Sequence, residues 1–346
     1  MSFVVLPSAL VAASVAVRGV QLHWGRQAPY KPSEGISTAQ QLDLAHDLLG
    51  PGGWVRTAIS SDQLADWRSE LQPALEGRSL SLLALLNHDN ASTDDPAQLH
   101  AEARAEARNV SNAVCGIAAG RHVFELSNEL DLKCMKHDGI GRNGMVVDDY
   151  NQTAWRRYRA ILSGLAAGVA DGCGARAERV INTGGWLHFG FLELLRQAAI
   201  PYEIVAWHWY SEMGLINCTS GSAAGGCFDV AARLASYNRT IWVTETDRRF
   251  GSSNKTSGNE TRGGELQQAR VLGGLLDNFG ALPTGRRLEA VFVYEALDQP
   301  QLEPSPEAEY GLQRVGRAAP AGPWALGEPK RAFETVRQWA RGTGRG

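Results

Sequence analysis

The chain has 346 residues, of which 44% are hydrophobic and 21% are charged. This is enough apolar material for one large core, because single α/β barrels run to roughly 250 residues and beyond. The 34 basic and 37 acidic side chains give a formal net charge of −3. Nucleic acids and anionic membranes both need a basic face on the protein, so this balance argues against either as a partner.

The N-terminal segment is apolar. Residues 2–17 carry no charge and end in small residues. Two interpretations stay open: a secretory signal, although basic residues are missing before Arg18, or an early strand or capping segment of the fold. Its length of about 16 residues is short of the roughly 20 that a membrane-spanning helix needs. We therefore divide the chain into this segment, residues 1–16, and one large domain, residues 17–346.

Acceptor sites for N-glycosylation are frequent. The Asn-x-Ser/Thr pattern begins at seven of the 13 asparagines: Asn90, Asn109, Asn151, Asn217, Asn238, Asn254 and Asn259. Each marks a surface position if the chain passes through the secretory pathway. The number of sites favours a secreted glycoprotein.

Five cysteines leave at least one thiol unpaired within the chain. Cys218 and Cys227 enclose a loop rich in Gly and Ser, so we expect a local disulfide between them. There is no C-x-x-C pair, and a structural zinc site is therefore not predicted.

Short β-branched or apolar runs alternate with longer amphipathic stretches along the chain. In chain order, the predicted strands are Val17–His23, Trp54–Ile59, Leu80–Leu86, His122–Ser127, Arg179–Thr183, Glu203–His208, Thr240–Thr244 and Leu288–Glu295. The clearest predicted helices are Pro96–Ala118, Asp149–Ala170, Gly264–Asn278 and Lys330–Ala340. Eight repeats of strand and helix predict a parallel sheet closed into a (β/α)₈ TIM barrel. The alternative, an open doubly wound sheet, usually has a Gly-rich phosphate loop after its first strand, and this chain has none.

Two glutamates follow predicted strands. Glu129 comes directly after the fourth strand, in HVFELSNE, and Glu245 comes at the end of the seventh, in TIWVTETD. Both carboxylates are thus expected at the C-terminal mouth of the barrel, where enzymes with this fold carry their active sites. A facing pair of carboxylates is what glycoside hydrolysis requires. Strand alternation makes Glu125 a buried or helix-facing structural acid, and Asp247 either contacts sugar or caps a loop.

The order of these segments resembles that of clan A glycoside hydrolases, with the closest likeness to family 39 and family 5-like retaining enzymes. The resemblance extends from Val17 to Val336. It rests on the pieces WVRTAISSD, LLALLNHDN, FELSNE, NTGG, VAWHWYS, WVTETD, VFVYEALDQP, EYGLQRV and EPKRAFETVRQW. Each piece is weak alone, whereas their order and spacing are specific for the clan.

The resemblance implies a retaining reaction by double displacement, with Glu129 as acid/base and Glu245 as nucleophile. It also implies that Asn128 binds the substrate 2-hydroxyl and that Arg56 orients the nucleophile and keeps it ionised. If these roles are right, the two carboxyl groups should lie about 5–5.5 Å apart.

Further candidate substrate-binding residues follow by position. Tyr210 matches a tyrosine that hydrogen-bonds the nucleophile, and His208 matches a histidine that lines the same wall. Tyr294, next to Glu295, stands where strand eight usually supplies an aromatic floor, often Trp. Loop residues at the predicted mouth complete the set: His23, Asn87, His88 and Trp186. In a further departure from the clan pattern, Leu130 replaces the proline that often follows the Asn-Glu pair.

Other functions stay open. One alternative is a non-catalytic carbohydrate-binding protein on a degenerate glycosidase barrel. A metal-dependent barrel hydrolase would need clustered His and carboxylate ligands, which the scattered histidines do not supply. Within the enzyme class, a heparanase-like endo-glucuronidase and a family 5-like endo-glucanase are the alternatives. The expected partner is a carbohydrate, no cofactor or metal is expected, and the residues indicate neither the sugar, nor endo or exo action, nor an oligomeric state.

Overall fold

The computed structural model describes residues 15–88, 93–116, 120–138, 141–220, 226–256, 263–286 and 288–342. Most of the apolar segment 1–16 therefore lies outside the described residues, as do Asn90 and Asn259 of the glycosylation pattern. Among the described residues, no helix combines the length and apolar character needed to cross a membrane.

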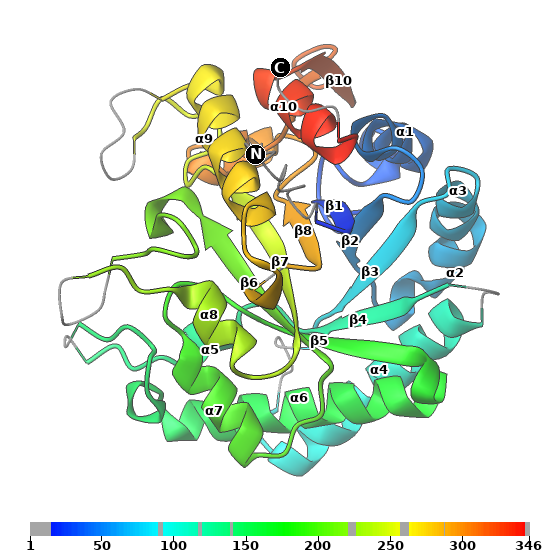
Figure 1. The fold of residues 1–346 in the computed structure, drawn as a ribbon. Coiled ribbons are helices and arrows are strands. Elements are labelled where there is room, and N and C mark those ends of the chain that lie inside the picture. Colours follow the sequence, from blue (N-terminus) through cyan, green and yellow to red (C-terminus); the bar gives the residue numbers. More distant parts are fainter. Residues whose placement is uncertain are drawn as a thin grey trace, which may run out of the picture.

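Eight parallel strands form a closed barrel in sequence order. They are β1 Val17–Gln21, β2 Trp54–Ala58, β3 Ser81–Leu86, β4 His122–Leu126, β5 Ala177–Thr183, β6 Ile204–Tyr210, β7 Thr240–Asp247 and β8 Ala290–Val293. Strand β1 pairs with both β2 and β8, which closes the sheet. The predicted (β/α)₈ barrel is thus confirmed, and Figure 1 shows its strands at the centre with helices around them.

The helices of the described part lie outside the barrel. They are α1 Thr38–Leu49, α2 Leu64–Asp66, α3 Gln72–Glu76, α4 Pro96–Cys115, α5 Leu130–Cys134, α6 Gln152–Cys173, α7 Phe189–Gln197, α8 Val230–Ala235, α9 Glu265–Gly280 and α10 Arg331–Ala340. The two longest, α4 and α6, begin at side-chain caps, because Asp95 and Asn151 accept hydrogen bonds from the first backbone N–H groups of these helices.

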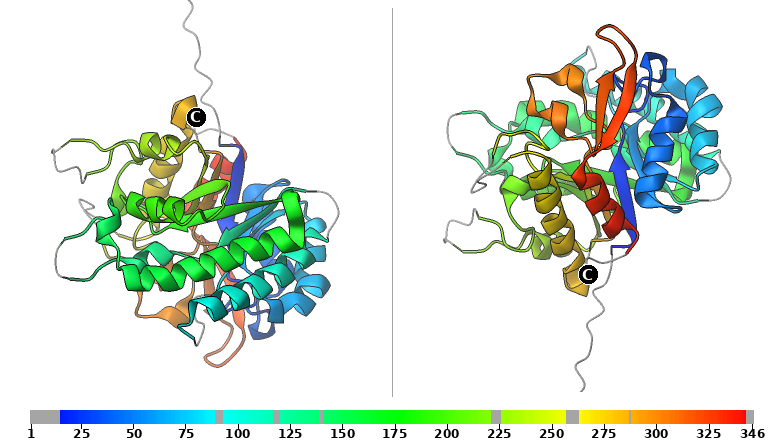
Figure 2. Two further views of the ribbon diagram at one scale, coloured as in Figure 1. Left: turned by 90° about the horizontal axis from the view of Figure 1, so that it is seen from below. Right: turned by 90° about the horizontal axis from the view of Figure 1, so that it is seen from above.

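Helices α4 and α6 run side by side along one flank of the barrel (Figure 2). Gly164 and Gly168 of α6 face α4 so closely that a Cβ atom would lie 2.4 Å from the carbonyl oxygen of His100 and 2.3 Å from that of Arg104. Only glycine permits this approach of the two backbones. A disulfide between Cys115 and Cys173 joins the C-terminal ends of the same two helices.

Two layers of apolar side chains make up the core. The larger lies between the sheet and the helices. The smaller fills the barrel interior with side chains of alternate strand positions: Trp54, Leu83, Val123, Val180, Ile204, Ala206, Trp242, Ala290 and Phe292. These apolar side chains fill the N-terminal part of the barrel interior, and the polar inward-facing residues lie at its C-terminal mouth.

All eight predicted strands are present, with shifted ends. Strand β6 continues to Tyr210 and β7 to Asp247, beyond the predicted ends at His208 and Thr244. The four predicted helices are confirmed as α4, α6, α9 and α10, with each described end within three residues of its predicted position. The predicted end at Ala118 lies outside the described residues. An antiparallel hairpin between β8 and α10, of strands β9 Gln313–Arg317 and β10 Trp324–Pro329, was not predicted.

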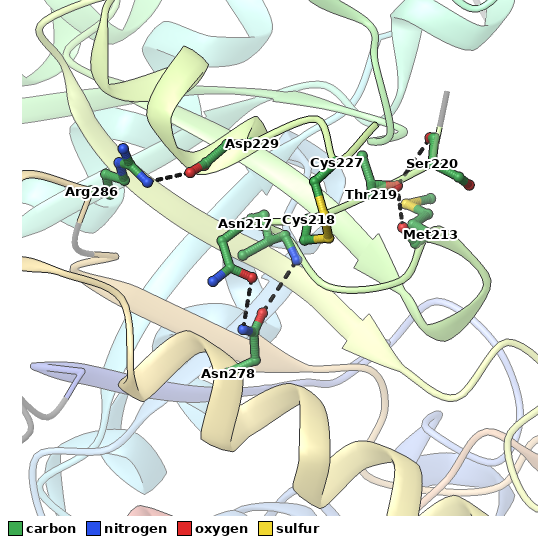
Figure 3. Close-up of a disulfide and its surroundings, with 10 residues drawn as sticks. Met213, Asn217, Cys218, Thr219, Ser220, Cys227, Asp229, Asn278 and Arg286 are labelled. Atoms are coloured by element: carbon green, nitrogen blue, oxygen red, sulfur yellow. Dashed lines mark hydrogen bonds and ion pairs between the residues drawn. A yellow bond between two sulfur atoms is a disulfide. The ribbon is translucent and has the colours of Figure 1, made fainter. Parts of the chain in front are cut away.

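The expected disulfide between Cys218 and Cys227 is present, and it closes the loop after β6 (Figure 3). This loop is tied to its surroundings by the side chain of Asn278, which accepts from the backbone N–H of Ile216 at 3.2 Å and donates to Asn217 at 3.0 Å. Arg286 forms an ion pair with Asp229 at the end of the loop. The remaining cysteine, Cys134, is a buried free thiol.

Candidate active site

A cavity of about 720 Å³ opens at the C-terminal ends of the strands. Its lining includes most of the predicted site residues: His23, Arg56, Asn87, His88, Asn128, Glu129, Tyr210, Glu245 and Tyr294. These side chains come from the ends of β1 to β4 and β6 to β8, so the barrel gathers at one place residues that lie far apart in the sequence.

Glu129 reaches the cavity because the chain leaves strand geometry at the end of β4. Ser127 and Glu129 have positive φ angles, 69° and 49°, which turn the backbone between β4 and α5. The alternation of side chains along β4 therefore stops at Leu126. The turn directs Asn128 and Glu129 to the cavity, where the Glu129 side chain is 28% exposed.

Glu245 reaches the cavity through a bulge in β7. Trp207 and His208 of β6 are partners of Val243 and Glu245, so β7 contains one residue more than β6 at this point. Trp242 already faces the barrel interior, and uninterrupted alternation would therefore turn Glu245 outward. The bulge reverses the alternation and brings Glu245 inside, where its side chain is only 9% exposed.

A buried arginine holds this second carboxylate. The Nη1 atom of Arg56 lies 2.6 Å from Oε1 of Glu245 and 2.8 Å from Oε1 of Gln21, and Nη2 donates to Oδ1 of Asn128 at 2.7 Å. Its Nε donates to Glu125. Burial alone would lower the pKa of Arg56, but the charges of Glu125 and Glu245 outweigh burial and raise this pKa above its usual range.

A phenol completes the hold on Glu245. The hydroxyl of Tyr210 donates to Oε2 of Glu245 at 2.8 Å. Burial and the charge of Glu245 raise the pKa of Tyr210 well above its ordinary value, so the phenol keeps its proton and remains a donor. Glu245 is thus fixed on one oxygen by a guanidinium and on the other by a phenol.

Glu129 has a different neighbour. The Nδ1 atom of His208 lies 2.7 Å from Oε1 of Glu129 and 3.4 Å from Oε2 of Glu245. The imidazole is fully buried, and burial alone would lower its pKa. The nearby carboxylates of Glu245 and Glu129 outweigh burial, so the pKa of His208 is raised above 6.5.

The two carboxylates face each other at short range. An oxygen of Glu129 and an oxygen of Glu245 lie within 4.8 Å of one another. In inverting glycosidases the two carboxyl groups stand about 6.5–9.5 Å apart to admit a water molecule, and in retaining ones about 5–5.5 Å. A distance this short between one oxygen of each group is compatible with the retaining arrangement.

The same atoms, together with Nδ1 of His208, have the spacing of a cation site. However, both oxygens of Glu245 already accept hydrogen bonds, from Arg56 and Tyr210. The guanidinium beside them also repels any cation that approaches. These contacts favour acid–base chemistry over metal binding at this cluster.

The cavity walls carry the remaining predicted residues. Tyr294 follows β8, and its ring lies edge-on to those of His23 and Tyr210, with centroids 5.7 and 6.3 Å apart. Opposite polar groups come from the loop after β3, where the buried Oδ1 of Asn87 has no hydrogen-bond partner among the described residues. Aromatic rings together with polar groups are common in the lining of ligand pockets.

Two predicted residues lie elsewhere than expected. Trp186 does not line the cavity: its ring packs on the core, and Nε1 donates to the backbone oxygen of Ser220 at 3.1 Å. His208 does not line the wall but lies buried behind the two catalytic candidates. The backbone of Trp186 has a positive φ of 48°.

Several cavity residues were missed. Gln21 could have been found, because alternation on β1 places it on the same face as His23. Tyr310 belongs to the quoted segment EYGLQRV, and Arg249 follows β7 by two residues, but neither pattern indicated that these side chains reach the cavity. Glu125 is buried, as expected, and its carboxylate accepts a hydrogen bond from Nε of Arg56.

Asp247 has a structural role. It is fully buried and accepts hydrogen bonds from the backbone N–H of Arg248 at 2.6 Å and from Nε2 of Gln268 at 2.8 Å. It does not line the cavity, which favours the loop-capping alternative. Glu295 is also buried, with its carboxylate bound by Tyr30 at 2.9 Å and by Gln299 at 2.6 Å.

Comparison with known proteins places the fold. No protein-family model matches the sequence, and no curated protein matches it. Among solved structures, a family 1 β-glucosidase from Thermotoga maritima is 11% identical with a TM-score of 0.61, and the match covers 94% of this chain and 97% of that one. The β-glycosidase from the hyperthermophile Thermosphaera aggregans is 10% identical with a TM-score of 0.61, covering 95% and 96%.

A third similar structure is the hyperthermophilic β-glucosidase from Pyrococcus furiosus, 11% identical with a TM-score of 0.55 and 96% of each chain covered. At such identities the likeness establishes the barrel fold alone. It is the fold that the resemblance to clan A implies, whereas the narrower likeness to family 39 or family 5 stays a prediction.

Proposed function

We propose that this protein is a retaining glycoside hydrolase that cleaves β-glycosidic bonds of an oligo- or polysaccharide, with Glu129 as acid/base and Glu245 as nucleophile. One observation carries the proposal: two carboxylates with unequal surroundings face each other within 4.8 Å at the mouth of a (β/α)₈ barrel. Their surroundings match the two roles that double displacement requires.

Glu245 has the surroundings of a nucleophile. The guanidinium of Arg56 and the phenol of Tyr210 each donate a hydrogen bond to one of its oxygens. In the first step the carboxylate attacks the anomeric carbon and forms a glycosyl ester, while the bond from that carbon to the leaving oxygen breaks. The hydrogen bonds fix the attacking oxygen in place.

Glu129 is more exposed and has no arginine partner among the described residues. It gives its proton to the leaving oxygen in the first step. In the second step it takes a proton from water, whose oxygen attacks the anomeric carbon as the ester bond to Glu245 breaks. Product and substrate then have the same anomeric configuration.

Three features support a site that still catalyses rather than only binds. Both carboxylates are present, Arg56 and Tyr210 hold one of them, and Asn128 is held by Arg56 beside the acid/base. Buried charges carry a desolvation cost. Their presence in this network is therefore easier to explain if the site catalyses a reaction than if it only binds sugar. The choice of sugar and the length of the chain cleaved rest on the loops around the cavity.

Variants at the two glutamates test the proposal. Purified wild type, Glu129→Ala and Glu245→Ala would be assayed on aryl β-glycosides and β-linked polysaccharides, with and without azide. Azide should restore activity to Glu245→Ala with a glycosyl azide of inverted configuration, and to Glu129→Ala with one of retained configuration, because azide enters on opposite faces. Glu289→Gln, a carboxylate paired with Arg121 at the other end of β8, serves as the control.

Activity in the wild type with no azide product from either variant would contradict the assignment of roles. A folded wild type that binds glycans but cleaves none would favour the non-catalytic alternative.

We also propose that the chain passes through the secretory pathway. The five acceptor asparagines that the structure describes, Asn109, Asn151, Asn217, Asn238 and Asn254, are all exposed. Two disulfides add support, since such bonds persist in oxidising compartments. Expression in a eukaryotic cell should give secreted protein whose mass falls on treatment with an N-glycosidase. Retention inside the cell without glycans would contradict this proposal.

A further inference from the structure

The turn that presents Glu129 is unfavourable on its own. Ser127 and Glu129 both adopt positive φ angles, 69° and 49°, with an asparagine between them. Residues with a Cβ atom rarely adopt this conformation, because it brings Cβ against the backbone. Such a turn persists only where its surroundings hold it in place.

One side chain from the neighbouring strand holds both ends of this turn. The Oδ1 atom of Asn182, on β5, accepts from the backbone N–H of Glu129 at 2.8 Å. Its Nδ2 atom donates to the backbone oxygen of Ser127 at 2.7 Å. The orientation of the amide is fixed by these partners, since the N–H needs an acceptor and the C=O needs a donor. Asn182 is 4% exposed, so water does not readily replace either bond.

The nucleophile is held mainly by contacts outside this turn, to which it is linked through the hydrogen bond from Arg56 to Asn128. Glu245 is placed by the bulge in β7 and by its bonds to Arg56 and Tyr210. The start of α5 also has its own attachment, because the carboxylate of Asp131 accepts from the backbone N–H of Gly184 at 2.9 and 3.0 Å. Loss of the Asn182 side chain would thus affect the turn at residues 127–129 while α5 and Glu245 keep their contacts.

We infer that Asn182 is a positioning residue for the acid/base: its amide fixes the turn that sets the proton of Glu129 against the leaving oxygen. This inference rests on the proposed function. It predicts a selective defect, because proton donation matters for poor leaving groups and not for those that depart as stable anions.

The test is the leaving-group dependence of kcat/KM, which reports the first chemical step. Asn182→Ala should lower kcat/KM for phenyl glycosides or disaccharides by roughly 10- to 100-fold, within the range of general acid catalysis, and leave dinitrophenyl glycosides almost unchanged. The quantity compared is the ratio of kcat/KM between poor and good leaving groups, measured on one sample of the variant. A lower fraction of folded protein reduces both values equally and leaves this ratio unchanged. Azide should also raise kcat of the variant on dinitrophenyl glycosides, since this anion needs no general base.

Two further variants keep the test decisive. Asn182→Asp preserves the volume and an acceptor for the Glu129 N–H but sets an oxygen against the backbone oxygen of Ser127, so it should show the same selective loss and serve if the alanine variant does not fold. Thr183→Val removes the hydroxyl that accepts from the backbone N–H of Gly185 at 3.3 Å, next along the same strand. This control should show the wild-type dependence on the leaving group.

Equal losses on all leaving groups in Asn182→Ala would overturn the inference while leaving the proposed function intact. Wild-type behaviour of that variant on every substrate would also overturn it. A wild-type protein inactive on all glycosides would instead refute the proposed function itself, so the two failures are distinguishable.

Discussion

The imidazole of His208 forms a hydrogen bond with Glu129, with Nδ1 2.7 Å from Oε1. The ring is wholly buried, whereas the side chain of Glu129 is partly exposed. The same nitrogen lies 3.4 Å from Glu245. One buried, titratable ring therefore contacts both carboxylates of the site, and its charge depends on theirs.

The charge of His208 predicts a pH-dependent contribution to stability. Because Glu245 and Glu129 raise its pKa above 6.5 in the folded state despite burial, the protonated ring stabilises the fold below pH 6.5. This stabilisation is lost as the pH rises through the raised pKa. The difference in unfolding free energy between wild type and His208→Gln should thus be larger near pH 6 than near pH 9.

Urea unfolding across that pH range measures this difference. His137→Gln, a substitution at an exposed histidine, is the control and should give no such trend. A wild-type advantage over His208→Gln that does not change with pH would show that the ring acts by packing alone.

The contact of Arg56 with Glu125 predicts strong coupling in a double-mutant cycle. Both side chains are buried, with 1% and 0% exposed. Arg56→Met should cost about 3–5 kcal/mol of unfolding free energy, because it leaves buried carboxylates without their cation. In the Arg56→Met background, Glu125→Met should lower the unfolding free energy much less than it does in the wild type. The reason is that it then removes a buried carboxylate that has lost its cation.

Chemical denaturation of the four proteins in the cycle gives the coupling. The exposed pair of Arg104 and Asp171 is a suitable comparison, because substitutions there should change stability little. Additive effects at Arg56 and Glu125 would contradict the shared-cation account.

The buried pair of Asp298 and Lys330 predicts a second pH-dependent contribution to stability, in which burial and not a neighbouring charge raises the pKa. Burial raises the pKa of Asp298 to about 7, although Lys330 beside it lowers this pKa. Because the folded-state pKa lies above the unfolded one, the contribution of Asp298 is fully present below pH 3.8 and is lost as the pH rises toward about 7. Asp298→Asn should flatten the fall in melting temperature between about pH 4 and pH 7. An unchanged slope would refute this source.

The two disulfides should differ in their contribution. Cys115 and Cys173 are 58 residues apart, and Cys218 and Cys227 are nine apart. In the chain-entropy account, removing the first should cost about 4 kcal/mol and the second about 2.5 kcal/mol. Paired Cys→Ser variants compared by urea unfolding test the order. A larger loss from the shorter loop would contradict the account.

The sequence sufficed for the barrel and for the two carboxylates because these depend on local patterns. Strand alternation and punctuation marked all eight strands, and Glu129 and Glu245 stand at or just after the predicted ends of two of them. Tyr210 and Arg56 entered through the resemblance of their segments to the clan. These expectations needed no knowledge of which residues touch.

The remainder depends on contacts between distant segments. The bulge that turns Glu245 inward and the clamp by Asn182 become visible only when neighbouring strands are paired. Trp186 is expected at the mouth because it follows a strand, yet its ring packs on the core and its Nε1 donates to Ser220. The β9–β10 hairpin had no pattern that distinguished it from a loop.

The most direct test of double displacement at this site is the anomeric configuration of the first product. A β-linked substrate identified in the glycoside screen would be hydrolysed by the wild-type protein in an NMR tube, and the anomeric protons followed before mutarotation. With facing carboxylate oxygens within 4.8 Å, the β anomer should appear first and the α anomer only later. Initial release of the α anomer would show single displacement by water and would contradict the assignment of Glu245 as nucleophile.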